Sequence, residues 1–209
     1  MPRSLARLVA HDAVLPAAAN SLAVTGLTSD SRAVQPGFVF AALPGSKVDG
    51  ASFIPQAFGK GAIAVICAPG SYAGEGLVIP SDNPRWLLAR MAARYYDRQP
   101  DTVVAVTGTN GKTSVSVFVR QIWQAMGFRA ASLGTIGVVG PEGAEYLQHT
   151  TPDPVQLQAL AARLGEDHVS HLAIEASSHG LAQHRLDGLR LTAAAFTNIT
   201  RDHLDYHPT

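Results

Sequence analysis

Hydrophobic residues are arranged differently before and after Pro100. In the first hundred residues the apolar runs are short and lie between glycines and prolines. The runs at 37–43 and 63–67 therefore predict short strands. A short helix is expected between them, ending at Gly59 or Gly61. This half of the chain has the pattern of a small α/β domain.

A longer helix is expected immediately before Pro100. Asp82 or Asn83 can cap its start, and Pro84 suits its first turn because the missing N–H costs nothing there. Apolar residues follow at helical spacing until Gln99 and Pro100 end the pattern.

After Pro100, apolar strands alternate with helices. Residues 102–108 form a continuous apolar run of the kind that is buried on both faces of a parallel sheet. Helices are expected at 112–126 and 153–165. Further buried strands are expected within 130–140, 170–178 and 191–200. This alternation predicts a doubly wound, mostly parallel sheet. The whole chain is thus predicted to be α/β, with one domain at 1–100 and a second at 101–209.

Charge and cysteine content exclude several classes of protein. The chain carries 16 Lys+Arg and 16 Asp+Glu, so no net field favours nucleic acid or an acidic membrane. Cys67 is the only cysteine, which excludes an internal disulfide framework, and its apolar surroundings favour a buried thiol. No run approaches the roughly 20 apolar residues of a membrane span, and the N-terminus lacks the apolar core of a signal peptide. A soluble, cytoplasmic protein is expected.

A glycine-rich turn, "TGTNGKTS" at 107–114, joins the first strand of the second half to its first helix. Gly108 and Gly111 let backbone N–H groups approach an anion, and the helix N-terminus adds partial positive charge. Lys112 can reach the β- and γ-phosphates of a nucleotide, and the Thr113 hydroxyl can hold Mg²⁺. The strict G-x-x-x-x-G-K-[ST] pattern is not met, since Val106 occupies the first glycine position. The turn predicts a nucleotide phosphate site, with an ordinary strand-to-helix turn as the structural alternative.

Two later strands end in polar residues. Glu175 ends one apolar run, at the sheet edge where ligands of open α/β folds gather, and its carboxylate suits Mg²⁺. A helix cap or a salt bridge is the alternative role. Asp202 and His203 follow the strand predicted at 191–200, and His203 is a candidate for a second metal or phosphate contact. Its alternative is a solvated helix start.

Four segments together resemble the Mur ligase family: "TGTNGKTS", "HTTPDP", "EASSHGLAQHR" and "TNITRDHLDYH". Residues 28–66 are similar to the uridine-binding domain of that family. "GTNGKT" alone marks a wider group that includes folylpolyglutamate and cyanophycin synthetases. "SSHGL" with "QHR" and "TTP" is typical of the members that add the third residue to the peptide of UDP-N-acetylmuramoyl-L-alanyl-D-glutamate.

The resemblance implies an ATP-dependent amide ligase of peptidoglycan precursor synthesis. The γ-phosphate of ATP passes to a substrate carboxylate, and the amine of an amino acid then attacks the acyl phosphate. It implies ATP and Mg²⁺ as cofactors and small-molecule substrates, with no nucleic acid or membrane partner. The added residue, meso-diaminopimelate or L-lysine, stays open. The alternatives are a related ligase that adds D-alanyl-D-alanine, a phosphate-loop kinase or NTPase, and a non-catalytic nucleotide-binding module.

The resemblance also assigns residues to each ligand. Catalysis falls to Lys112, Glu175 and His203, and the Mg²⁺ ligands are Thr113, Glu175 and His203. The ATP phosphates are assigned to Gly108, Thr109, Asn110, Gly111, Lys112, Thr113 and Ser114. The UDP-muramoyl dipeptide is assigned to Ser29, Ser31, Ser46, Lys47, Val48, His149, Thr150, Thr151, Ser177, Gln183 and Arg185, with Asn110 nearby. His149 departs from the asparagine expected at its position.

The resemblance also sets two limits. In the family the central domain continues past "DHLDYH", a lysine there helps to bind Mg²⁺, and a third domain follows. The chain is therefore expected to be a fragment that is inactive alone and has an incomplete ATP-binding domain. "DNPR" at 82–85 equals the tetrapeptide that reads the added amino acid in diaminopimelate-adding members. It lies upstream of the phosphate loop rather than in the third domain, so it is interpreted as a helix cap.

Overall fold

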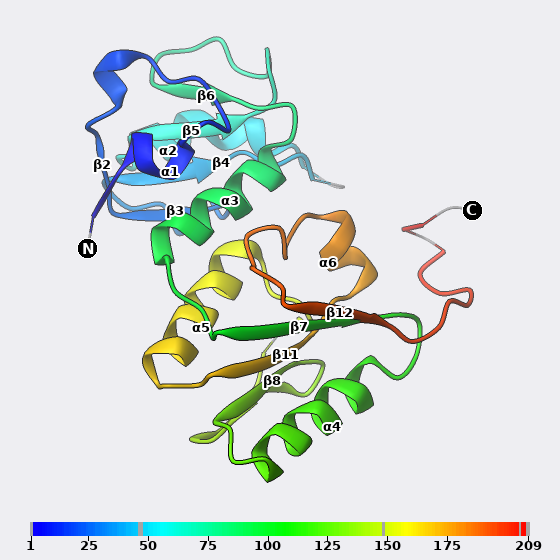
Figure 1. Ribbon diagram of the computed structural model, residues 1–209. Helices are drawn as coiled ribbons and strands as arrows, with labels where there is room; N and C mark the ends of the chain where they lie inside the picture. Colours follow the sequence, from blue (N-terminus) through cyan, green and yellow to red (C-terminus); the bar gives the residue numbers. More distant parts are fainter. Residues whose placement is uncertain (1, 46–47, 148, 205, 208–209) are drawn as a thin grey trace. The chain divides into compact units, whose positions relative to one another are not determined.

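The computed structural model describes the chain except for residues 1, 46–47, 148, 205 and 208–209. It divides into two compact units, Met1–Tyr95 and Tyr96–Thr209 (Figure 1). Both units contain parallel sheets packed with helices, so the predicted α/β class is confirmed.

The first unit is built on four parallel strands in the order β3 (Gly26–Thr28), β4 (Phe38–Ala41), β5 (Ala64–Cys67) and β6 (Val78–Pro80). Its remaining elements are β1 (Arg3–Ser4) paired antiparallel with β2 (Ala23–Val24), helices α1 (Leu5–Val9), α2 (Ile54–Gly59) and α3 (Pro84–Tyr96), and 3-10 turns Ala17–Ala19 and Gly50–Phe53. Phe40, Ile54 and Val65 pack in its core beside the buried thiol of Cys67. The Asn83 side-chain Oδ1 accepts from the Trp86 N–H at 3.1 Å, which confirms the predicted cap of α3.

The second unit contains a six-stranded sheet with the order β10-β9-β8-β11-β7-β12. Strands β8 (Ala130–Gly134), β11 (His171–Glu175), β7 (Thr102–Thr107) and β12 (Ala193–Phe196) are parallel. Strands β9 (Gly137–Gly140) and β10 (Gly143–Glu145) complete one edge in antiparallel pairing. Helices α4 (Lys112–Ala125), α5 (Pro154–Glu166) and α6 (Ser178–Ala182) join the strands, and α4 and α5 lie on opposite faces of the sheet (Figure 1).

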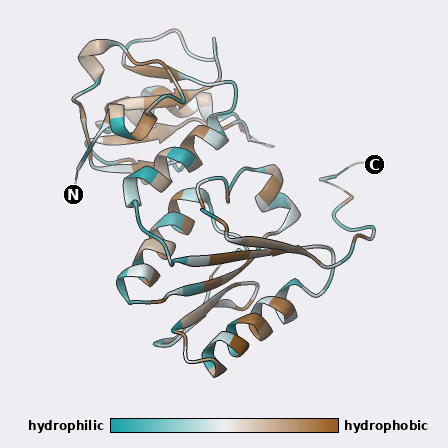
Figure 2. Ribbon diagram, viewed as in Figure 1, coloured by the Kyte–Doolittle hydropathy of each residue, from teal (hydrophilic) through white to brown (hydrophobic). Residues whose placement is uncertain are grey.

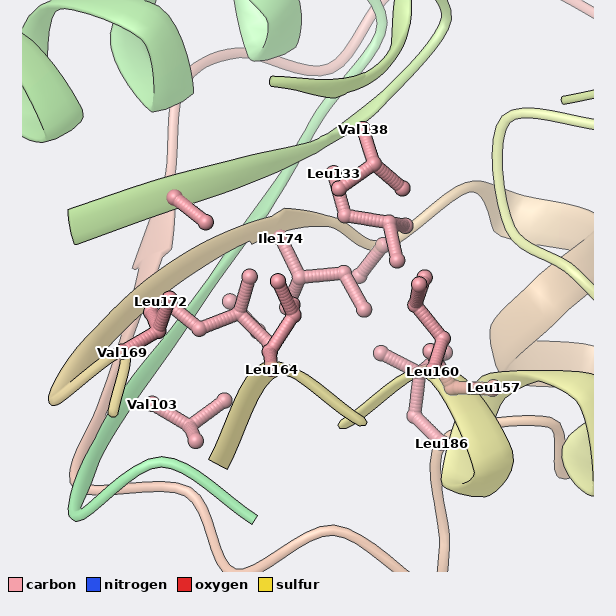
Figure 3. Packing of buried hydrophobic residues seen from close by; sticks show 13 residues of the cluster. Val103, Leu133, Val138, Leu157, Leu160, Leu164, Val169, Leu172, Ile174 and Leu186 are labelled. Atoms are coloured by element: carbon pink, nitrogen blue, oxygen red, sulfur yellow. The ribbon is translucent and has the colours of Figure 1, made fainter. Parts of the chain in front are cut away.

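The core of the second unit lies between the sheet and α5. Leu157, Leu160 and Leu164 of α5 lie one turn apart and pack on Leu133 and Ile174 of the sheet (Figure 3). Because side chains alternate along a strand, Glu175 next to Ile174 points to the face that α4 covers. The carboxyl ends of β8, β11, β7 and β12 all lie at one edge of the sheet, where the polar residues of the site gather.

Strand β12 differs from the prediction of a buried strand. All four of its residues are exposed, and Phe196 keeps 61% of its surface. The strand has β7 as its only neighbour in the described sheet, so its second edge and both of its faces are open. Helix α4 also exposes Phe118, Ile122 and Met126, which give it a hydrophobic stripe (Figure 2). None of the described helices is long and apolar enough to cross a membrane.

Candidate functional site

The phosphate loop, defined here as Gly108–Gly111, connects β7 to α4. Gly108 and Gly111 have φ angles of +130° and +87°, a region that favours glycine. A Cβ on Gly108 would overlap the Thr197 hydroxyl, so the loop backbone also requires glycine for space. The loop thus has a backbone conformation that requires glycine at position 108 and favours it at position 111.

The N–H groups of this region fall into two sets. The Thr109 N–H donates to the Asn198 carbonyl oxygen at 2.9 Å, and the Asn110 N–H donates to Asn198 Oδ1 at 3.1 Å. The N–H groups of residues 111–114 find no acceptor among the described residues, and they lie at the N-terminus of α4. The N–H donors without a partner in the described residues are therefore those of residues 111–114, which directly follow Asn110.

Lys112 bends back over the loop. Its ammonium donates to the carbonyl oxygens of Gly108 at 2.6 Å and Thr109 at 3.0 Å. An ammonium has three N–H donors, so one remains for an anion. The Lys112 side chain also lines the cavity described below, so a positive charge lies in that cavity at the N-terminus of α4.

Glu175 is a buried carboxylate, 1% exposed, at the end of β11. Its oxygens accept from the Thr113 hydroxyl at 2.9 Å, from the Thr135 N–H at 2.8 Å and from the Thr135 hydroxyl at 3.2 Å. All three donors are neutral, and no described Lys, Arg or His pairs with Glu175. A buried carboxylate without a cationic partner, next to a hydroxyl, fits the oxygen ligands of a hard divalent cation. No cluster of three or more His, Cys, Asp or Glu in the described residues is arranged to hold a metal by itself.

A cavity of about 760 Å³ opens at this edge of the sheet. Its walls come from the phosphate loop with Lys112, from the turns after β8 and β11, and from the segment after β12. Among the predicted site residues it is lined by Gly108, Thr109, Lys112, Thr150, Ser177 and His203. The structure therefore brings some of the predicted phosphate and substrate residues of the second unit to one cavity together with His203. Glu175 and Thr113 are not in this lining and connect to it through Thr135, which lines the cavity and donates to Glu175.

The segment after β11 is held by a network centred on Thr151. The buried Thr151 hydroxyl donates to the Glu175 carbonyl oxygen at 2.9 Å and accepts from the Ser177 N–H at 3.1 Å. The Arg185 guanidinium donates to the Thr151 carbonyl oxygen at 2.5 Å and to Gln183 Oε1 at 2.7 Å. Thr151 thus braces the segment, and its hydroxyl is not turned to the cavity.

His149 takes another position: it lines a separate depression of about 530 Å³ with Arg163 and Gln156, rather than the cavity that Thr150 and His203 line. His203 is exposed, and its ring lies edge-on to His179 at 4.7 Å between centroids. Its Nε2 lies 3.7 Å from Asp202 Oδ2.

The first unit has a cleft of its own, of about 640 Å³, lined by Ser29, Ser31 and Val48 among others. Ser46 and Lys47, also assigned to the uridine nucleotide, lie outside the described residues. Hydrogen bonds from the Arg32 guanidinium and N–H lower the pKa of Asp30 on the same loop. Lys60 donates to the Ser31 carbonyl oxygen at 2.9 Å, which supports this loop from α2.

The sequence reasoning missed two residues that the structure places at the centre of the site. Thr135 binds both oxygens of Glu175, and Asn198 binds the phosphate loop. Each directly follows a strand end, Thr135 after β8 and Asn198 two residues after β12. That position at the carboxyl edge of a parallel sheet was the available signal.

Fold and site together define a phosphate-loop α/β protein with a polar cavity at the carboxyl edge of its parallel sheet. The model of the Mur ligase middle domain matches residues 106–209, and that of the Mur ligase family catalytic domain matches residues 23–96. The chain belongs to the Mur ligase family.

Two curated relatives that are more than 50% identical to this chain carry the same name. The UDP-N-acetylmuramoyl-L-alanyl-D-glutamate--2,6-diaminopimelate ligase of Rhizobium meliloti is 55% identical over 192 residues, which are 91% of this chain and 40% of that protein. The ligase of the same name from Brucella melitensis is 52% identical over 207 residues, 98% of this chain and 42% of that protein. The chain thus spans about 40% of the length of these relatives.

Solved structures agree with the fold. A structure of UDP-N-acetylmuramoyl-L-alanyl-D-glutamate--2,6-diaminopimelate ligase matches with a TM-score of 0.86 and 31% identity, covering 100% of this chain and 42% of that chain. MurF ligase from Thermotoga maritima in complex with ADP matches with a TM-score of 0.56 and 21% identity, covering 88% of this chain and 39% of that one. The second likeness concerns the fold alone.

Proposed function

We propose that this chain carries the UDP-substrate site and the ATP site of a ligase that adds diaminopimelate to UDP-N-acetylmuramoyl-L-alanyl-D-glutamate. The first domain, residues 1–100, takes the uridine nucleotide, and the second, residues 101–209, takes ATP. The observation that carries the proposal is one cavity lined by Lys112 of α4 and by Thr135, whose N–H and hydroxyl donate to the buried Glu175 carboxylate that Thr113 also contacts. The shared name of the relatives supports diaminopimelate over L-lysine as the added residue.

The chain's own residues have separate roles in this reaction. The N–H groups of residues 111–114 and the Lys112 ammonium bind the phosphates of ATP and neutralise charge as the γ-phosphate passes to the D-glutamyl carboxylate. This transfer forms an acyl phosphate and releases ADP. The amine of the incoming amino acid then attacks the acyl carbon, and phosphate leaves as the amide forms.

Thr113 and Glu175 would hold Mg²⁺, with His203 toward a second ion. Mg²⁺ supplies further charge neutralisation at the phosphates when it is bound. Thr150, Ser177, Gln183 and Arg185 would hold the dipeptide portion of the substrate, and Thr151 acts by bracing that segment. In this proposal ATP and Mg²⁺ are the cofactors and both other substrates are small molecules.

Calorimetric titration of the 209-residue chain tests the proposal. UDP-N-acetylmuramoyl-L-alanyl-D-glutamate and ADP with Mg²⁺ are expected to bind independently, one molecule of each per chain. Ser31→Ala should weaken only the UDP ligand, and Lys112→Ala only ADP. If the chain binds neither ligand, or if one substitution abolishes both, the proposed division of the sites is wrong.

The reaction class is tested with hydroxylamine in place of the amino acid, in a protein that also carries the third domain that the family resemblance implies. An acyl phosphate would be trapped as a hydroxamate of the UDP-dipeptide, which requires both ATP and the free D-glutamyl carboxylate. Phosphate release that is independent of the UDP-dipeptide would instead favour the phosphate-loop NTPase alternative.

A further inference from the structure

The segment Thr197–Thr200, which follows β12, binds the phosphate loop at several points. The Thr197 hydroxyl donates to the Asn110 carbonyl oxygen at 2.7 Å. The Thr200 N–H donates to the Thr109 hydroxyl at 2.8 Å, which donates in turn to the Thr200 carbonyl oxygen at 3.2 Å. The two segments are about 90 residues apart in the chain, so β12 and its pairing with β7 bring them together.

Asn198 makes the most specific of these contacts. Its Oδ1 accepts from the Asn110 N–H at 3.1 Å, and its Nδ2 donates to the Asn110 carbonyl oxygen at 3.0 Å. Its own carbonyl oxygen accepts from the Thr109 N–H at 2.9 Å. The side-chain amide therefore binds both backbone polar groups of Asn110 through its acceptor and its donor, a geometry that fixes the two peptide units on either side of that residue.

This contact determines which N–H groups are available to an anion. With Thr109 and Asn110 engaged by Asn198, the donors left at the site are those of residues 111–114, where the partial positive charge of α4 is also greatest. Without Asn198 the two peptide units that flank Asn110 would be free to turn, and the backbone leading into Gly111 and α4 would lose this constraint.

We propose that Asn198 is a positioning residue: its side-chain amide holds the phosphate loop in the conformation that directs the N–H groups of residues 111–114 at a nucleotide phosphate. The proposal rests on the proposed function for the identity of the anion. The loop geometry itself can be tested without any ligand.

The first experiment measures amide hydrogen exchange and ¹⁵N chemical shifts in the 209-residue chain. In the wild type, the Thr109 and Asn110 amides should be protected and those of Lys112 and Thr113 should exchange freely. Asn198→Ala should remove the protection of Asn110, and ADP added to the wild type should shift Lys112 and Thr113 most. Unprotected Thr109 and Asn110 amides in the wild type, or unchanged protection in Asn198→Ala, would overturn the proposal.

The second experiment measures the affinity for ADP. Asn198→Ala loses two hydrogen bonds of the loop and should bind ADP about tenfold more weakly. Asn198→Asp should be weaker still, because a carboxylate oxygen would face the Asn110 carbonyl oxygen. The control is Asn20→Ala, an exposed asparagine of the first unit whose side chain makes no hydrogen bond to the described residues.

Binding of the UDP ligand distinguishes a variant that has lost its fold from one in which only the phosphate loop is misplaced. Binding of UDP-N-acetylmuramoyl-L-alanyl-D-glutamate should stay at the wild-type level in both Asn198 variants. Wild-type ADP affinity in Asn198→Ala would sink the inference while leaving the ligase proposal standing. If wild-type protein binds no ADP, the ligase proposal fails, and the exchange measurement still decides the role of Asn198.

Discussion

The cavity of the second unit and the cleft of the first unit differ in the chemical groups that form them. The cavity lies beside the N-terminus of α4, and its walls are connected to a buried carboxylate and to hydrogen bonds that join four strand ends. The cleft is formed by side chains on a loop, with the exposed Asp30–Arg32 pair at its edge. The first arrangement fixes charges in place before a ligand arrives, which suits phosphoryl transfer. The second has the adaptable side chains of a binding cleft.

The largest expected effect is the loss of ATP affinity when the positive charge of Lys112 is removed from the second unit. Lys112→Ala should lower affinity for ATP about 10- to 100-fold, since hydrogen bonds to charged groups contribute about 1.5–3 kcal/mol. Lys60→Ala serves as the comparison in the first unit, where Lys60 supports the Ser31 carbonyl. Titration of each variant with ATP and with the UDP ligand checks the prediction. Equal losses for both ligands in Lys112→Ala would show that the lysine supports the fold rather than the site.

Gly108→Ala should destabilise the second unit through its backbone. A side chain at φ +130° costs about 1–3 kcal/mol, and the new methyl group would also overlap the Thr197 hydroxyl. Gly127→Ala is a matched control, because Gly127 has φ +89° and no atom within 4 Å of an added Cβ. Urea unfolding followed by Trp123 fluorescence should show the larger loss for Gly108→Ala. Equal losses would show that contact with the 197–200 segment contributes nothing.

Thr135→Val tests the buried carboxylate. Removing one donor from Glu175 should cost about 1–3 kcal/mol of stability and weaken ADP binding in the presence of Mg²⁺ more than in its absence. Thr135→Ser keeps the hydroxyl and should restore both properties. If Thr135→Val binds ADP with the same Mg²⁺ dependence as the wild type, Thr135 does not orient Glu175 for a metal.

The smallest expected effect is a change in how the stability of the first unit depends on pH. Burial of Asp12 raises its pKa, but hydrogen bonds and charge from Arg94 and Arg90 outweigh this and lower it below 3.8. The ionised Asp12, bound by Arg94 and Arg90, therefore contributes its full stabilisation of the first unit at pH values above the ordinary pKa of an aspartate. This stabilisation is lost as the pH falls through the lowered pKa of Asp12. Trp86 and Trp123 lie one in each unit, so Trp123→Phe leaves a reporter for the first unit alone. In acid titrations, Asp12→Asn in that background should flatten the low-pH loss of stability. An unchanged profile would assign the loss to other carboxylates.

Local patterns in the sequence were enough for the longer helices and for the strand-to-helix turn at the phosphate loop, whereas the short strands β3 and β6 of the first unit were not predicted. Helices α3, α4 and α5 begin close to the residues predicted from Asn83, the 107–114 turn and Asp153, because caps and apolar spacing act within one or two turns. The special backbone role of Gly108 and Gly111 could be predicted for the same reason, because a positive φ depends on the residue type at a single position.

Only the tertiary structure decided how these pieces meet. Asn198 engages an amide 88 residues away, and Thr135 and Thr113 reach Glu175 across 40 and 62 residues. Hydropathy predicted a buried β12, yet burial depends on which neighbours cover a strand, and β12 is exposed. His149 likewise turned to a separate depression although Thr150 beside it lines the cavity. Periodicity and motifs carry information over a few residues, whereas hydrogen-bond partners are set by strand order and register over the whole sheet.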